Sequence, residues 1–239
     1  MTTIINPSFE SLDWTDILSG PASSNQQPEG WELTWLRPTV GDIKGEQLWD
    51  SSNPDDVATG IPECVHKLAE QLPPSQQPGG SDALILDGVV VYKAFSATAK
   101  FGAQLRQVVT GLEPGSLAVV DVPVQIHRHG DEDKYAAEVG VWANGSGVWK
   151  QPPDKTWDSF TTWGTVDADG KVEILIRFKS KWALPKDFFI DDIGYSFVPA
   201  SVEPEEPEEP TGRVLVGTYH IGVFSDGTSE IDYEVADNG

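Results

Sequence analysis

The sequence predicts an all-β protein built as an antiparallel β-sandwich. Several stretches alternate between apolar and polar residues with the two-residue period of a strand. Turns rich in glycine, proline and asparagine separate these stretches. A helical period occurs convincingly at only one place, around residues 54–72. Many short strands with almost no helix are typical of sandwiches and barrels.

The clearest strand is expected at residues 117–129. Ala118, Val120 and Val122 share one side of it, and Asp121 and Gln125 share the other. Such a pattern indicates a half-buried strand with a polar outer face. The same reasoning predicts further strands at residues 83–92, 104–110, 137–142 and 172–179.

The helical period around residues 54–72 comes from apolar residues that roughly share one face, namely Val57, Ile61, Val65, Leu68 and Leu72. Pro62 interrupts this pattern, and proline breaks a helix interior. We therefore expect at most a short helix on a long loop between strands. Residues 49–80 are longer than a minimal sandwich needs, so this insert is a candidate cover for a binding surface.

A charged proline run divides the chain. Residues 203–210 read Glu-Pro-Glu-Glu-Pro-Glu-Glu-Pro, which predicts an extended spacer. We expect a sandwich domain over residues 1–202, a linker over 203–212 and a β-hairpin segment over 213–239, with its turn at Ser225-Asp226-Gly227. Because a lone hairpin is marginal in water, it should dock on the sandwich, on another copy or on a protein partner.

The composition excludes some classes of partner. The formal charge is 16 − 38 = −22, which repels nucleic acid and anionic membranes but not a neutral polysaccharide. Surplus carboxylates also attract divalent cations. Cys64 is the only cysteine, so no intrachain disulfide can form and a buried thiol is expected. No signal peptide is recognisable, and we expect an extracellular or virion-surface location reached after leader removal or host-cell lysis.

Three groups of residues carry a resemblance to a known family. The opening Asn6-Pro7-Ser8-Phe9-Glu10 with Pro28-Glu29-Gly30-Trp31, the central residues 102–115 and the closing residues 188–193 occur in order. Together they resemble the galactose-binding-like jelly rolls of carbohydrate-binding modules. The resemblance implies two antiparallel sheets whose first and last strands meet, with Trp31 and Trp163 in the core.

The resemblance also implies a structural Ca²⁺ where the first and last strands meet. Glu10 and Asp191 would supply carboxylate ligands, with Asp192 beside them. Two neighbouring carboxylates need something to offset their repulsion, and a hard cation does so. The alternative is that one of them accepts backbone N–H bonds and no metal is present.

Strand alternation also predicts a binding surface. Polar or aromatic residues stand opposite the apolar faces at Gln104, Arg106, Gln125, His127, Glu138, Trp142 and Arg177. We expect adjacent strands to gather them on one concave sheet face, with Tyr92 and Trp182 at its rim. Flat rings beside planar hydrogen-bonding groups are suited to sugars. A solvated sheet face is polar in any case, which is the alternative.

The remaining chemistry is sparse. His127 and His129 could hold a transition metal, or they could mark a solvated strand end. No nucleophile elbow, phosphate loop or zinc helix is recognisable. The sequence therefore predicts a non-catalytic glycan-binding protein. The alternative is a structural or assembly protein, such as a phage surface, decoration or tail component, that uses the same fold for protein contacts.

Overall fold

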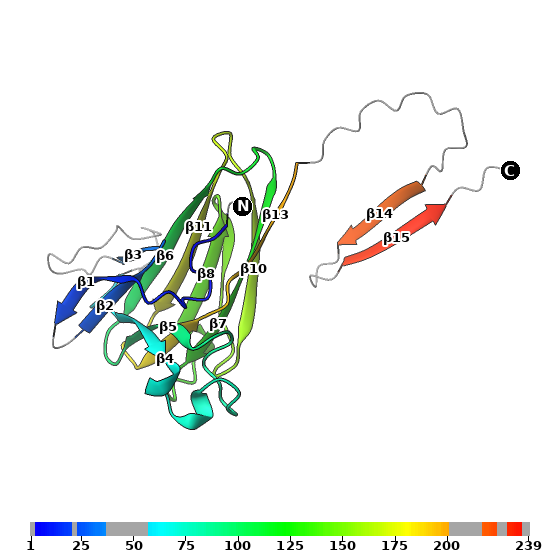
Figure 1. Cartoon of the computed structure of the whole chain (residues 1–239). Helices are drawn as coiled ribbons and strands as arrows, with labels where there is room; N and C mark the ends of the chain where they lie inside the picture. The colour runs from blue at the N-terminus through cyan, green and yellow to red at the C-terminus, as the bar shows by residue number, and fades with distance from the viewer. Residues whose placement is uncertain (1–2, 21–22, 37–56, 201–216, 224–228, 236–239) are drawn as a thin grey trace, which may run out of the picture. The chain divides into compact units, whose positions relative to one another are not determined.

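The computed structural model describes residues 3–20, 23–36, 57–200, 217–223 and 229–235 (Figure 1). The chain divides into two units, residues 1–200 and residues 201–239. The first unit consists of two β-sheets packed face to face, which confirms the predicted sandwich. None of the described residues forms a helix long and apolar enough to cross a membrane.

The larger sheet has eight strands in the order β1-β2-β4-β5-β12-β7-β10, with β13 also paired to β7. Its strands are β1 (Trp14–Gly20), β2 (Ser23–Pro28), β4 (Glu63–Leu68), β5 (Val90–Ser96), β7 (Leu117–His127), β10 (Asp158–Thr165), β12 (Lys186–Ile190) and β13 (Gly194–Val198). Neighbours are antiparallel except β2 and β4, which meet in parallel at Asn25 and Cys64.

The smaller sheet has five strands in the order β3-β6-β11-β8-β9. They are β3 (Glu32–Trp35), β6 (Phe101–Thr110), β8 (Ala137–Ala143), β9 (Ser146–Lys150) and β11 (Lys171–Ser180). Strands β6 and β11 pair along their whole length, from Phe101 opposite Ser180 to Thr110 opposite Lys171. This pair is the rigid centre on which the outer face of the smaller sheet is built.

The core lies between the two sheets. Strand β7 contributes its apolar side, and strand β11 does the same. The fully buried residues are Ala118, Val120, Val122, Val124 and Ile126 of β7 and Val172, Ile174, Ile176 and Phe178 of β11. The alternation therefore predicted which side of each of these strands is buried. Cys64 is buried as expected, and burial raises the pKa of its thiol above the usual range.

A second apolar cluster covers part of the outer face of the larger sheet. Leu84 and Ile85 pack there on Val91 of β5 and Phe189 of β12. Trp157 joins the cluster and donates a hydrogen bond from Nε1 to the carbonyl of Ala83 at 3.0 Å. Loop residues therefore bury this side of the sheet, which leaves β5 apolar on both faces.

Two elements predicted from the sequence differ in the structure. The helix expected within residues 54–72 is instead strand β4, followed by short 3₁₀ turns at Ala69–Gln71 and Pro74–Gln76. The strand expected over residues 83–92 begins only at Val90, because the preceding apolar residues form the loop cluster just described. Within the long insert, β4 belongs to the larger sheet and Thr59 is hydrogen-bonded to Lys100, just before residue 101, whereas residues 49–56 lie outside the described part.

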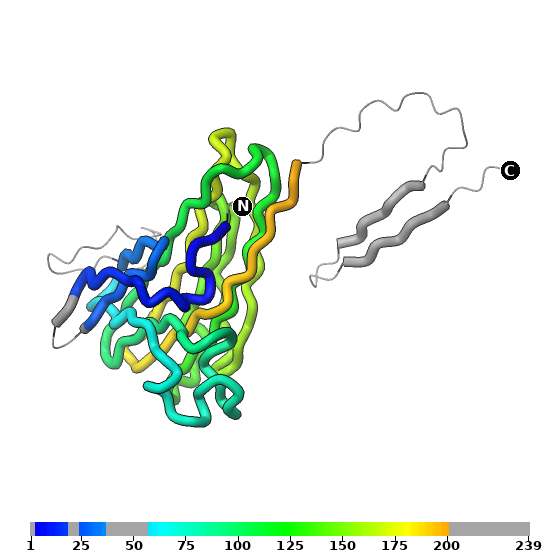
Figure 2. The backbone as a smooth tube through the Cα atoms, viewed as in Figure 1, coloured from blue at the N-terminus to red at the C-terminus, as the bar shows by residue number. Residues whose placement is uncertain are grey.

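The opening and closing segments of the first unit meet. The amide of Ile193 donates to the carbonyl of Pro7 at 3.0 Å. Thr3 Oγ1 and Tyr195 Oη lie 2.5 Å apart. Figure 2 shows the first residues (dark blue) beside the segment that leads into β13 (orange).

In the second unit, β14 (Gly217–Val223) and β15 (Ser229–Val235) form an antiparallel pair. The predicted turn residues 225–227 and the predicted linker, residues 203–212, lie outside the described residues.

Candidate binding site

Four of the predicted ligand-binding residues share one surface. Gln104 and Arg106 of β6, Arg177 of β11 and Trp142 of β8 lie on the outer face of the smaller sheet, opposite its core residues. Arg177 stands opposite Gln104 on one side and Gly140 on the other. The alternation of three separate strands thus brings these side chains together as predicted.

Gln125 and His127 do not join them. Both belong to β7, and they lie on the outer face of the larger sheet, where Gln125 pairs with Phe189. The prediction of one common face is wrong for these two residues, because β7 and β8 are in different sheets. The His127 ring contacts the Phe189 ring at 5.1 Å, and burial lowers the His127 pKa.

Tyr92 and Trp182 do not form a common rim. Tyr92 is fully buried, stacks on Phe9 at 5.2 Å and donates from Oη to the carbonyl of Gln26, so its assignment to a binding rim is wrong. Trp182 lies just beyond the end of β11 and is 40% exposed. Its indole Nε1 donates to Asp133 Oδ2 at 3.0 Å, which fixes the ring at one end of the sandwich.

Two tryptophan rings lie against the outer surface of the smaller sheet. The rings of Trp142 and Trp149 meet edge to face at 5.1 Å. A Cβ atom on Gly140 would lie 2.2 Å from Trp142 Cη2, and one on Gly147 would lie 2.5 Å from Trp142 Cδ1. The Trp142 ring therefore rests directly on two glycines of β8 and β9, and both tryptophans are only partly buried.

The sequence suggests Trp149 only as a residue in or near a loop, within a less favoured loop-borne sugar platform of Trp142, Trp149, Trp157 and Trp163, although a signal for the sheet face is present. Asn144 and Gly145 both have positive φ, 44° and 82°, and form the two-residue turn between β8 and β9. That turn sets Trp149 opposite Gly140 and Gly147 opposite Trp142. An Asn-Gly turn with this register predicts that both rings share one face.

Cationic side chains hold these rings. The Arg177 guanidinium lies 4.9 Å from the centre of the Trp142 ring, and Lys179 Nζ lies 4.5 Å from the Trp149 ring. Arg177 Nε donates to Gln104 Oε1 at 2.7 Å, and Gln104 Nε2 donates to Thr34 Oγ1 at 3.3 Å. This chain of contacts fixes a guanidinium and an amide beside an indole ring.

Ion pairs border the rings. Arg106 bonds Glu32 and Glu173, which raises the Arg106 pKa further, and Lys181 Nζ lies 2.8 Å from Glu138 Oε1. With Arg177 and Lys179, this set holds four cations and three carboxylates. The face is therefore locally not negative, in a chain of formal charge −22.

The predicted calcium ligands hold a loop. Glu10 Oε1 accepts hydrogen bonds from the amides of Val89 and Val90 at 2.8 and 2.7 Å. Asp191 Oδ2 accepts from Leu86 and Asp87, and its Oδ1 accepts from Asp192. Backbone amides therefore donate to both carboxylates, whereas the alternative expected this of only one of them.

No group of three or more His, Cys, Asp or Glu side chains in the described part of the chain is arranged to hold a metal. Glu10, Asp191 and Asp192 thus do not gather into a cluster of three carboxylates. Burial raises the pKa of Asp191 to about 7, against the effect of its three amide bonds. Calcium binding at this loop stays a prediction.

The two histidines at the end of β7 have protein partners. His127 Nε2 lies 2.9 Å from Gln125 Oε1, and His129 Nε2 lies within hydrogen-bonding distance of Asp187 Oδ2. Lys93 Nζ lies 2.6 Å from the other oxygen of Asp187. These contacts describe a hydrogen-bonded strand end better than a metal site.

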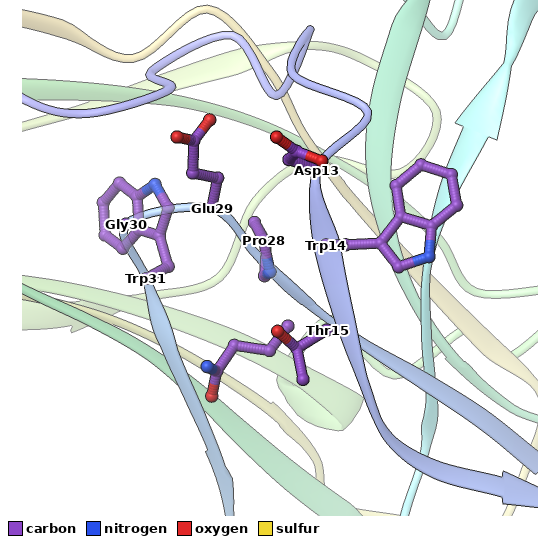
Figure 3. Close-up of a pocket in the computed structure, with 8 residues that line it drawn as sticks. Asp13, Trp14, Thr15, Pro28, Glu29, Gly30 and Trp31 are labelled. Atoms are coloured by element: carbon purple, nitrogen blue, oxygen red, sulfur yellow. The ribbon is translucent and has the colours of Figure 1, made fainter.

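A hollow of about 530 Å³ lies where β1 begins and β2 ends. Figure 3 shows the carboxylates of Asp13 and Glu29 on the same side of it. Trp14 is partly buried and stacks on His66 at 4.7 Å, and Trp31 is only 2% exposed, so the Trp31 ring offers no open surface. The burial of Trp31 confirms its predicted place in the core, whereas Trp163 is 61% exposed and its predicted core position is wrong.

No family model and no curated protein matches the sequence. Solved structures similar to the chain include several carbohydrate-binding modules. TmCBM61, in complex with β-1,4-galactotriose, is 13% identical with a TM-score of 0.47, over 82% of this chain and 98% of that one. The enzymatically active domain of bacteriophage CBA120 tailspike protein 4 is 12% identical with a TM-score of 0.45, over 82% of this chain and 21% of that one.

A third structure, a promiscuous carbohydrate-binding module of the β-sandwich superfamily, is 11% identical with a TM-score of 0.38, over 70% of this chain and 57% of that one. At these identities the likeness concerns the arrangement of strands alone. The ligands named for those proteins are not thereby assigned to this chain.

Proposed function

We propose that this chain binds glycans, without turning them over, through the outer face of the smaller sheet. We call this surface the tryptophan face; it consists of Arg106, Trp142, Trp149 and Arg177, supported by Gln104 and Lys179, which are each only 2% exposed. The observation that carries the proposal is the Trp142 ring, which rests on Gly140 and Gly147 outside the core, with the Arg177 guanidinium against it.

The chemistry of this face suits a sugar. An indole ring can cover the apolar C–H face of a pyranose, which needs a flat partner. Gln104, buried and bonded to Thr34, holds the Arg177 guanidinium in a fixed orientation beside that ring, and a preorganised group loses little entropy on binding. The balanced local charge adds no repulsion for a neutral polymer.

Affinity electrophoresis tests this proposal. Wild-type protein is run in gels that contain galactan, xylan, mannan or soluble β-glucan, and we expect retardation in at least one of them. Trp142→Ala should weaken the binding about tenfold or more, since truncation of a central aromatic anchor costs more than about 1 kcal/mol. The melting temperature should change little. Tyr135→Ala is the control, because Tyr135 is 50% exposed and lies off the tryptophan face.

Two results would contradict the proposal. If none of the polysaccharides retards the protein in the gel, the proposal that the chain binds glycans is wrong. A Trp142→Ala variant that loses several kcal/mol of stability yet keeps its retardation would show that the ring serves packing.

A further inference from the structure

An open groove runs along the edge of the sandwich next to the tryptophan face. It lies between the edge strands β9 and β10 and has a volume of about 460 Å³. Its lining residues are Ser146, Gly147, Val148, Lys150, Thr161, Thr162 and Trp163. The volume falls within the range of pockets that hold small ligands.

The walls of this edge groove are tied together. Thr162 Oγ1 donates to the carbonyl of Ser146 at 3.0 Å, which links β10 to β9. Phe160, 2% exposed, packs nearby, and Lys150 Nζ lies 5.3 Å from the centre of its ring. The relative position of the two strands is therefore fixed before any ligand arrives.

The groove exposes apolar surface on both walls. Trp163 is 61% exposed on β10, and Val148 is 57% exposed on β9. An indole with this exposure gives up much of the free energy that burial would supply, roughly 25 cal/mol per Å² of apolar surface. Thr161 adds a hydroxyl beside it, held by Asp121 at 2.6 Å.

The groove is continuous with the tryptophan face. Gly147 lies against the Trp142 ring and also lines the groove. Trp163 and Thr161 lie on the outer side of β10, so a glycan chain on the tryptophan face reaches them by passing round the edge of the sandwich, over β9 and the groove. The lining side chains include the cation Lys150, and the Asp121 carboxylate lies next to the groove, bonded to the lining hydroxyl of Thr161.

We propose that the edge groove is a second subsite for the same glycan chain. One pyranose ring stacks on Trp163, with Lys150 Nζ and the Thr161 hydroxyl as polar contacts. This inference rests on the proposed glycan binding, but it assigns different residues. Polymers long enough to span both surfaces gain an effective concentration at the second one, whereas trisaccharides occupy one surface at a time.

The test uses full-length protein labelled with 5-fluorotryptophan. The ¹⁹F resonances of Trp142 and Trp163 are assigned with Trp142→Phe and Trp163→Phe. Galactan, xylan, mannan, β-glucan and their trisaccharides are then titrated. We expect one polymer to shift both resonances and its trisaccharide to bind at least tenfold more weakly. Trp163→Ala should lower the affinity for the polymer severalfold, leave that for the trisaccharide on the tryptophan face unchanged, and keep the melting temperature.

The outcomes separate the two proposals. A glycan that shifts the Trp142 resonance and leaves that of Trp163 in place overturns the edge groove and supports the tryptophan face. The reverse result overturns the tryptophan face and, with it, the role of the groove as a second subsite, and leaves the groove as a separate sugar site. No shift with any member of the panel overturns both. A Trp163 shift that follows protein concentration without glycan, together with dimers in sedimentation, assigns the groove to a second copy of the chain and overturns the sugar subsite.

Discussion

The carboxylates of Glu10 and Asp191 hold the loop of residues 86–90, and this arrangement depends on Gly88. Its φ is +67°, and a Cβ atom there would lie 2.3 to 2.7 Å from three atoms of the Glu10 carboxyl group. Only glycine allows the carboxylate to approach this closely and accept the amides of Val89 and Val90.

Gly88→Ala should therefore destabilise the protein more than its backbone conformation alone explains. Gly79 is the matched control, since its φ is +79° and a Cβ atom there would meet nothing within 4 Å. We expect Gly79→Ala to cost about 1 kcal/mol for a left-handed residue. Gly88→Ala should cost roughly 1–3 kcal/mol more, because the amide of the buried Val90 loses its acceptor. Equal losses in urea unfolding would show that Glu10 does not hold the loop.

His66 makes the fold sensitive to acid. It is 4% exposed, and burial lowers its pKa to about 4. Its Nδ1 lies 3.2 Å from Gln26 Oε1, an acceptor, so Nδ1 carries the proton and Nε2 is buried without a partner. Protonation would place a second, unpaired N–H and a charge in the core.

Because the folded pKa lies below the unfolded value of about 6.5, the unfolded state takes up the proton first. The contribution of neutral His66 is complete above pH 6.5 and declines as the pH falls toward 4, by about 3 kcal/mol in total. We expect the free energy of unfolding of wild type, measured with urea, to decrease relative to that of His66→Gln as the pH falls over this range, since the opposite contribution of Asp191 is common to both proteins. Parallel curves would contradict the assignment.

At the scale of elements, the β8–β9 hairpin positions the tryptophan face through Gly140. The three atoms nearest to a Cβ atom there are ring atoms, Cη2 and Cζ3 of Trp142 and Cε3 of Trp149. The far end of a side chain can move, so Gly140→Ala should lift the rings without a large loss of stability.

We predict that Gly140→Ala weakens glycan binding while the melting temperature stays within a few degrees of wild type. Gly145→Ala in the turn of the same hairpin is the control, because a Cβ atom there meets nothing within 4 Å. It should lose stability for its positive φ and keep its affinity. An affinity that Gly140→Ala leaves intact would mean that the ring position does not matter for binding.

Alternation along single strands predicted much of this architecture. It identified which side of β6, β7, β8 and β11 enters the core, because a polar residue on the inner side would be buried without a partner. It could not say which sheet a strand joins. Gln125 and Trp142 both lie outside the core, yet their strands belong to different sheets, and that is decided by pairing between distant segments.

Alternation also fails to identify strands that are buried on both faces of a sheet. Val90, Val91 and Tyr92 are all buried, because loop residues cover the outer face of β5. Alternation then disappears, and Tyr92 cannot be told from a residue at an open rim. In β4, Cys64 faces the core and Val65 is covered on the other side, and the resulting apolar spacing imitates a helix.

At the scale of the whole molecule, the charge of −22 and the loop held by Glu10 and Asp191 bear on calcium. We predict that Ca²⁺ raises the melting temperature of the protein, since binding to the folded state alone stabilises it. Ligands would come from these carboxylates and from backbone carbonyls. Differential scanning calorimetry with Ca²⁺ and with a chelator is the measurement. Mg²⁺ is the control for general screening of the negative charge.

Asp191→Asn should remove the calcium-dependent part of the increase. Identical melting with ion and chelator, in protein shown by metal analysis to be calcium-free, would leave the backbone amides as the partners of both carboxylates.

The contact between Thr3 and Tyr195 has a consequence for engineering. Residues near the two ends of the first unit, Thr3 and Tyr195, therefore lie side by side. A short glycine-serine bridge from residue 198 back to residue 3 would join these ends, and the Asn144-Gly145 turn could be cut to give new ends. The sandwich is thus suited to circular permutation. It is also suited to insertion as a whole into a loop of another protein, where two linkers would join it to the host.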